Sequence, residues 1–135
     1  MSEAISALNT ELDQSDMRGA IAGFPDQITQ SFAIMNNWEP QNEYPGIQKI
    51  MVLGMGGSAI GGDVARVISQ NTCTVPIVVN RSYNIPEWVD SHTLILASSY
   101  SGGTEETLSA FAQCRERNCP IIVLSTGGKI TELAN

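Results

Sequence analysis

Hydrophobic and polar positions follow one another along this chain in a pattern that predicts an α/β fold. Four short, nearly continuous apolar runs are expected to be strands, at residues 50–53, 75–79, 93–97 and 121–124. Between these runs, apolar residues recur at three- and four-residue spacings, as they do on one face of a helix. Apolar strands that alternate with helices are typical of a parallel sheet covered on both faces. The sequence therefore predicts a parallel, flavodoxin-like sheet flanked by helices.

The same pattern divides the chain into an N-terminal helical segment, residues 1–45, and an α/β domain, residues 46–135. Asp16 is expected to cap the first helix of the segment, and Pro25 to lie in the first turn of the second. The apolar stripes expected to pack are Met17, Ile21 and Phe24, then Ile28, Phe32 and Met35. The chain stops within a last helix that should lead into another strand. It is therefore expected to be a piece of a longer protein, truncated at the C-terminal end of the domain.

The helix after the first strand carries two glycines where helices seldom have them. Its apolar face is formed by Ile60, Val64, Val67 and Ile68. Gly61 and Gly62 fall in its first turns, where each costs roughly 1 kcal/mol relative to alanine. Either another element or a ligand approaches closely there, or the helix start is poorly formed. Residues 86–89 are expected to make one helical turn, and residues 104–117 the next long helix.

The composition and net charge of the chain exclude several classes of binding partner. The 135 residues are enough for one domain with a real core, and the formal net charge is −7. This charge argues against a nucleic-acid groove and against an anionic membrane surface. No apolar run approaches the ~20 residues of a membrane span. The three cysteines, an odd number without a C-x-x-C pair, fit a reducing cytoplasm, and the single His92 argues against a histidine metal site or a Ser-His-Asp triad.

The strongest candidate for chemistry is the turn after the third apolar run, which we call the serine turn, Ser99–Thr104. It combines the hydroxyls of Ser99, Ser101 and Thr104 with two glycines immediately before a helix. Glycines let backbone N–H groups close on a ligand, and a helix start carries partial positive charge. Thr104 could instead serve only as a helix cap, but capping explains one hydroxyl and not three. The turn therefore indicates an anion site, and a phosphate is the anion that this chemistry favours.

A second glycine turn, residues 54–58, follows the first strand and allows three interpretations. A P-loop is rejected because no lysine stands at the required spacing. Gly54, Gly56 and Ala59 match a relaxed dinucleotide fingerprint, and Arg81 after the second strand could hold a 2′-phosphate, which keeps NADP open. The third interpretation is a sugar-phosphate site shared with the serine turn. A strand order of 2-1-3-4 favours it, because both turns then lie side by side at the carboxyl edge of the sheet.

Two stretches of the sequence resemble a known family. The residues 54–63, Gly-Met-Gly-Gly-Ser-Ala-Ile-Gly-Gly-Asp, and the residues 99–107, Ser-Tyr-Ser-Gly-Gly-Thr-Glu-Glu-Thr, resemble the SIS (sugar isomerase) domain. More closely, they are similar to the N-terminal half of the bifunctional phosphoglucose/phosphomannose isomerases. The resemblance covers most of residues 16–134 and includes residues 24–27, 83–86 and 126–128.

The resemblance implies a sugar-phosphate ligand and an aldose–ketose isomerisation of glucose 6-phosphate and mannose 6-phosphate to fructose 6-phosphate. The residues that match the family's ligand-binding positions are Gly56, Gly57, Ser58, Ser99, Ser101 and Thr104. Gly103 departs from the asparagine or aspartate often found there. The family's catalytic residues are expected beyond residue 135, so none is assigned here. The resemblance also implies no metal or cofactor, and a homodimer whose site is completed by a second domain and by the partner subunit.

Two other functions remain open at this point. One is a non-catalytic SIS module that senses a sugar phosphate, although the N-terminal helices carry only Arg18 as a base with which to contact DNA. The other is an NADP-binding Rossmann domain, which depends on the relaxed fingerprint and on Arg81.

Overall fold

The computed structural model of this chain describes residues 13–40 and 42–134. The chain divides into two compact units, Met1–Glu43 and Tyr44–Asn135. The boundary between residues 45 and 46 remains a sequence-based prediction.

The first unit contains two helices, α2 (Met17–Ala22) and α3 (Phe24–Asn36). The Asp16 carboxylate accepts a hydrogen bond from Gly19 N at 3.1 Å, so the expected cap is present. Pro25 lies in the first turn of α3, where its missing N–H costs nothing. Phe24 begins α3 and does not end α2, because the chain turns at Gly23. Neither helix has a buried residue.

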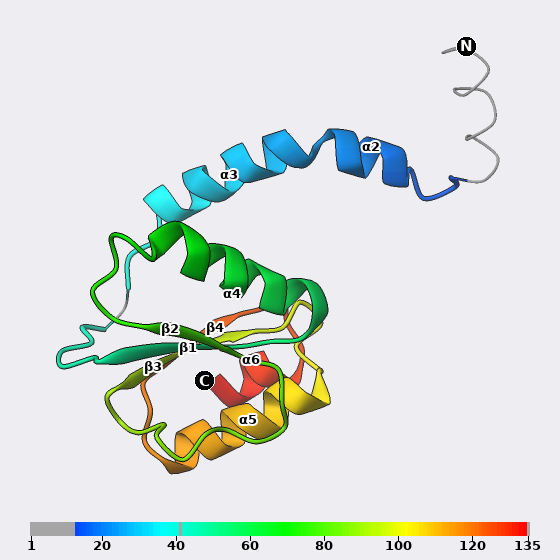
Figure 1. The fold of residues 1–135 in the computed structure, drawn as a ribbon. Coiled ribbons are helices and arrows are strands. Elements are labelled where there is room, and N and C mark those ends of the chain that lie inside the picture. The colour runs from blue at the N-terminus through cyan, green and yellow to red at the C-terminus, as the bar shows by residue number, and fades with distance from the viewer. Residues whose placement is uncertain (1–12, 41, 135) are drawn as a thin grey trace. The chain divides into compact units, whose positions relative to one another are not determined.

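The second unit is built on a four-stranded parallel sheet in the order β2-β1-β3-β4 (Figure 1). Its strands are β1 (Lys49–Leu53), β2 (Ile77–Asn80), β3 (Thr93–Ser98) and β4 (Ile121–Leu124). The predicted parallel sheet and its order 2-1-3-4 are confirmed. β2 begins at Ile77, later than predicted, and follows Pro76, which has no N–H to give to a ladder.

Helices cover both faces of this sheet. α4 (Gly56–Ser69) lies on one face, and α5 (Glu105–Glu116) and the short α6 (Lys129–Ala134) lie on the other (Figure 1). Residues 86–89 form a hydrogen-bonded turn, with Val89 N donating to Pro86 O at 3.2 Å, and not the helical turn expected from the sequence.

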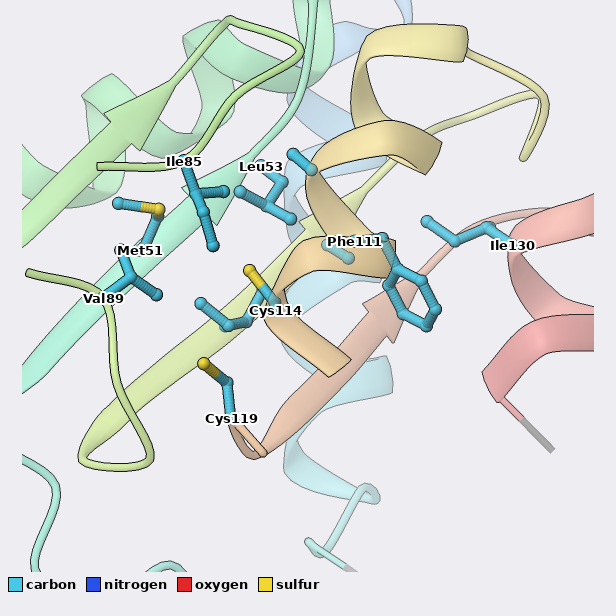
Figure 2. Packing of buried hydrophobic residues seen from close by; sticks show 11 residues of the cluster. Met51, Leu53, Ile85, Val89, Phe111, Cys114, Cys119 and Ile130 are labelled. Carbon is cyan, nitrogen blue, oxygen red and sulfur yellow. The ribbon is translucent and has the colours of Figure 1, made fainter. Parts of the chain in front are cut away.

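The main core lies between the sheet and the α5–α6 layer. Met51, Leu53 and Ile95 of the strands pack with Phe111 and Cys114 of α5 (Figure 2). The core also includes Ile85, Val89, Ala97, Ala110, Cys119 and Ile130. Two of these, Ile85 and Val89, come from the β2–β3 loop, so this loop is anchored and not free.

α4 contacts the sheet through small residues. A Cβ on Gly62 would stand 2.9 Å from Val52 Cγ1 and 3.1 Å from Val79 Cγ2, so the helix lies too close to β1 and β2 for a side chain there. A Cβ on Gly61 would meet nothing within 4 Å. Close helix approach therefore explains one of the two glycines.

The apolar face of α4 points away from the sheet. Ile60 is 60% exposed and Ile68 is 76% exposed, with Val64 and Val67 about half exposed. The sequence identified this face correctly as apolar, but the residues of α4 that pack on the sheet are the small ones, Ala59 and Gly62.

Candidate functional site

The two glycine turns meet at the carboxyl edge of the sheet. β1 and β3 are direct neighbours, with Leu53 opposite Ala97. A cleft of about 210 Å³ lies at this edge. It is lined by Ser58 of the first turn, Ser98 and Tyr100 at the end of β3, and Leu124, Ser125 and Thr126 at the end of β4. The strand adjacency that the sequence predicted is confirmed. The two turns reach this cleft through Ser58 and Tyr100, whereas the other predicted site residues, Gly56, Gly57, Ser99, Ser101 and Thr104, are not among its lining residues.

The hydroxyls of the serine turn lie close together. Ser99 is buried, and its Oγ is 3.1 Å from Thr104 Oγ1. Ser101 is exposed, and its Oγ accepts a hydrogen bond from Gly103 N at 3.3 Å. Thr104 is the N-cap residue of α5, yet its side chain makes no capping hydrogen bond and turns toward Ser99. Capping therefore does not account for the Thr104 hydroxyl, which belongs to the same polar cluster as Ser99.

The first turn opens to its surroundings. Gly56 and Gly57 are exposed at the start of α4, and a Cβ on either would have no atom within 4 Å. Packing within the described part of the chain therefore does not require glycine at these positions, but Gly56 has φ +51°, a backbone conformation that itself favours glycine. Bare backbone N–H groups at a helix start suit close approach by an anionic ligand.

A third turn, Ser125–Gly128 after β4, interlocks with the serine turn. Gly102 has φ +67°, and a Cβ on it would stand 1.7 Å from Gly127 O. Gly128 has φ +74°, and a Cβ on it would stand 2.4 Å from Ser101 O. Ile130 N donates to Gly102 O at 2.9 Å. The sequence signal for this turn is a third hydroxyl-glycine cluster directly after a strand, and the sequence analysis includes residues 126–128 only in the family resemblance, with no role in the site.

Charged groups surround the site unevenly. Glu105 and Glu106 occupy the first turn of α5, where the helix dipole favours them. The Tyr83 hydroxyl donates to Glu105 Oε2 at 3.4 Å. The charge of Glu106, partial desolvation and the charge of Glu105 raise the pKa of Tyr83. Lys129 begins α6 directly after Gly128 and makes no ion pair with the described residues.

Two residues singled out in the sequence, His92 and Arg81, are not available to the cleft. His92 immediately precedes β3, so it stands at the amino edge of the sheet, opposite the cleft. The Arg81 guanidinium pairs with the Asp63 carboxylate, which also lies 3.9 Å from Arg66. An NADP 2′-phosphate would have to compete with this carboxylate for Arg81.

Larger cavities occur away from the two turns. One of about 290 Å³ lies where α4 ends and β2 begins, and one of about 250 Å³ lies between α5, β4 and α6. Neither contains a glycine turn or a helix start. Across residues 13–40 and 42–134, no three His, Cys, Asp or Glu side chains gather as a metal site needs, and no helix is long and apolar enough to cross a membrane.

Known proteins support the sequence resemblance, although no family model matches the chain. A bifunctional phosphoglucose/phosphomannose isomerase from Caldicellulosiruptor bescii is 44% identical over 115 residues, which are 85% of this chain and 34% of that protein. The enzyme of the same name from Thermoplasma acidophilum is 40% identical over 84 residues, 62% of this chain and 26% of that protein. The chain thus spans only about a third or less of the length of these curated relatives.

Solved structures agree on the fold. The tagatose-6-phosphate ketose/aldose isomerase from Escherichia coli superposes with a TM-score of 0.56 at 16% identity, covering 87% of this chain and 34% of that one. The Vibrio vulnificus NanR protein, complexed with ManNAc-6P, superposes with a TM-score of 0.54 at 17% identity, covering 96% of this chain and 51% of that one. This chain is therefore a relative of the bifunctional phosphoglucose/phosphomannose isomerases, and its α/β unit has the SIS-type fold of phosphosugar isomerases.

Proposed function

We propose that this chain binds a sugar phosphate as part of an isomerase that interconverts glucose 6-phosphate or mannose 6-phosphate with fructose 6-phosphate. The observation that carries the proposal is that the first turn and the serine turn follow neighbouring strands at the same edge of the sheet, with Ser58 and Tyr100 lining one cleft there. A dinucleotide fold needs only the first turn and gives no reason for the second. The relatives named above act on sugar phosphates by their names, which supports the same ligand class here.

The phosphate is assigned to the serine turn. Ser101 and Thr104 supply hydroxyl donors, the buried Ser99 hydroxyl bonds to that of Thr104 and so orients it, and the α5 start adds the partial positive charge of a helix N-terminus. Since the whole chain carries a net charge of −7, this local geometry has to overcome a weak bulk repulsion. Lys129 directly follows Gly128, the last residue of the turn after β4, and makes no ion pair with the described residues.

The sugar is assigned to the first turn. Gly56 and Gly57 leave the backbone open, and Ser58 lines the cleft. These groups bind and orient a substrate but cannot abstract a proton near pH 7. We propose that the binding energy they supply holds C1 and C2 of the substrate in place for a carboxylate base, which passes a proton between the two carbons through an enediol.

That base is not among the residues of the cleft. Glu105 and Glu106 are close in sequence, but neither lines the cleft, and Glu105 already accepts a hydrogen bond from Tyr83. We therefore keep the proposal that the catalytic residues come from beyond residue 135. The 135-residue chain alone should bind a sugar phosphate with little stabilisation specific to the transition state, and so without enzymatic turnover.

The setting of the enzyme is also a proposal. We infer a cytoplasmic, glycolytic enzyme that works as a homodimer and needs no metal or cofactor. The three cysteines are free thiols, which suits a reducing compartment. The exposed apolar face of α4 offers a surface for packing against a second copy.

Calorimetric titration of the chain with fructose 6-phosphate, and separately with NADP, tests the ligand class. Fructose 6-phosphate should bind, and Ser101→Ala should weaken it by about 1.5–3 kcal/mol, because one charge-assisted hydrogen bond is lost. Ser91→Ala is the matched control, since Ser91 is exposed before β3 at the amino edge. Binding of NADP alone would overturn the proposal. An unchanged affinity in Ser101→Ala would show that Ser101 is only structural.

A sugar-phosphate-sensing module without catalysis is the second candidate. The NanR protein in complex with ManNAc-6P shares the fold over 96% of this chain, and this likeness favours keeping the candidate. Isomerase assays on the product of the complete reading frame, together with a DNA gel-shift assay, separate the two. Turnover of glucose 6-phosphate supports the enzyme, and DNA binding without turnover supports the sensor.

A further inference from the structure

We propose that Thr126 is a positioning residue that holds the serine turn in its anion-binding shape. The inference rests on the proposed function, because it assigns the phosphate to that turn. The Thr126 hydroxyl donates to Tyr100 O at 2.6 Å, and Thr126 N donates to the same oxygen at 3.2 Å. Tyr100 stands between Ser99 and Ser101, so both bonds reach the middle of the serine turn.

The serine turn and the turn after β4 are also joined by backbone hydrogen bonds, to which the Thr126 hydroxyl adds a bond from a side chain. Ser99 N donates to Leu124 O at 3.0 Å, and Ile130 N donates to Gly102 O at 2.9 Å. The Tyr100 side chain is 79% exposed, so its ring does little to fix the turn. A substitution at Thr126 can therefore weaken the tie at Tyr100 O while leaving the backbone bonds in place.

These ties set the direction of the amides on the other side of each peptide. In a trans peptide the C=O and N–H groups point in opposite directions. Because Tyr100 O and Gly102 O both point to the turn after β4, Ser101 N–H and Gly103 N–H point away from it. Gly103 N–H finds only the Ser101 hydroxyl, at 3.3 Å. Two amide donors are thus fixed on the side of the turn that carries the Ser101 hydroxyl.

Preorganised donors bind an anion more tightly than donors that must first be ordered. Loss of the Thr126 hydroxyl should let the peptide between Tyr100 and Ser101 rotate, so that part of the binding energy is spent on ordering it. Thr126 also lines the cleft, so a direct contact with the ligand is the competing explanation. A measurement made without ligand separates the two.

The test compares Thr126→Val, which removes the hydroxyl at nearly constant shape, with Thr126→Ser, which keeps it. Thr72→Val is the matched control, because the Thr72 hydroxyl also donates to a backbone carbonyl, Ser69 O at 3.2 Å, but beyond the end of α4. Thr126 is exposed, so its replacement should leave the chain folded, and Thr126→Ala serves as a second variant that also lacks the hydroxyl.

Two quantities are measured on the full chain: amide hydrogen exchange of Gly102 and Ile130, whose N–H groups are hydrogen-bonded to Ser99 O and Gly102 O, without ligand, and the affinities for fructose 6-phosphate and inorganic phosphate. Thr126→Val and Thr126→Ala should exchange these amides faster and bind both ligands about 3- to 10-fold more weakly, the equivalent of one hydrogen bond. Thr126→Ser and Thr72→Val should match the unchanged chain within about twofold.

Unchanged exchange in Thr126→Val would overturn the inference, whatever happens to affinity. Weaker binding with unchanged exchange would mean a direct ligand contact and no positioning role. If the chain without any substitution bound neither fructose 6-phosphate nor phosphate, the proposed function would be overturned. The exchange rates would then still decide the matter for Thr126: faster exchange supports its hold on the turn, and equal exchange refutes it.

Discussion

Gly102→Ala should disrupt the contact between the serine turn and the turn after β4 more than any other added methyl group at the carboxyl edge of the sheet. Gly102 has φ +67°, and the new Cβ would stand 1.7 Å from Gly127 O, a backbone atom that cannot rotate away. Ordinary non-bonded contacts lie near about 3.5 Å. The serine turn and the turn after β4 would therefore have to separate by about 1–2 Å.

The cost follows from the bonds between the two turns. A separation of that size would break the 2.9 Å bond from Ile130 N to Gly102 O and the 2.6 Å bond from the Thr126 hydroxyl to Tyr100 O. Each is worth about 0.5–1.5 kcal/mol, and the left-handed conformation costs a residue with a Cβ about 1–2 kcal/mol more. We expect Gly102→Ala to lower the free energy of unfolding by about 2–5 kcal/mol, a large part of a typical stability of about 5–15 kcal/mol.

Urea unfolding followed by circular dichroism measures this loss, and Gly103→Ala is the control. A Cβ on Gly103 would meet no atom within 4 Å, and its φ lies outside the left-handed region, so its stability should change by less than about 0.5 kcal/mol. If Gly102→Ala were as stable as Gly103→Ala, the two turns would not be locked together, and the argument for a preorganised anion site would fail.

Three further predictions concern the parts that support the site. The Arg117 guanidinium donates to Pro86 O, Glu87 O and Val89 O and so holds the β2–β3 loop. Arg117→Ala should therefore lower the free energy of unfolding by about 2–4 kcal/mol in urea titration. A loss below about 0.5 kcal/mol would mean that the loop's apolar residues are enough to hold it. Burial raises the pKa of the Cys114 thiol to about 12, so the folded state keeps a proton that the unfolded state releases, and stability should fall as pH rises from about 9 toward 12. Urea midpoints at rising pH check this, and a midpoint no more pH-dependent than that of Cys114→Val would contradict it. The buried Thr107 hydroxyl has no hydrogen-bond partner in the described chain, and the cavity beside it is too tight for a water molecule. Thr107→Val should therefore raise the free energy of unfolding by about 1–2 kcal/mol, measured by calorimetry. A lower melting temperature would show that the hydroxyl has a partner.

The strands and the helix start at the serine turn were predictable from local chemistry. The apolar runs ending at Leu53 and Ala97 became neighbouring strands, as the shared-site argument required. Asp16 and Pro25 act at helix starts as their side-chain chemistry predicts. These features depend on residues close together in sequence, so hydrophobic period and capping preference are enough to identify them.

Packing partners were not predictable in the same way. The pattern identified the apolar face of α4 but could not show that Ile60 and Ile68 point away from the sheet, because Gly62 allows the helix to approach Val52 and Val79. The role of Thr104 was also ambiguous, since its hydroxyl could cap α5 or turn to Ser99. The structure selects Ser99, at 3.1 Å.

The sequence by itself determined the parallel α/β architecture and the hydroxyl-glycine composition of the two predicted turns, because both follow from residue type and short-range spacing. Only the tertiary structure decided that a third turn, Ser125–Gly128, joins them and that Thr126 and Ile130 bond to the serine turn. The reason is physical. These contacts join residues 26 and 28 positions apart, and they exist only because β3 and β4 are neighbours whose carboxyl ends lie at the same edge of the sheet.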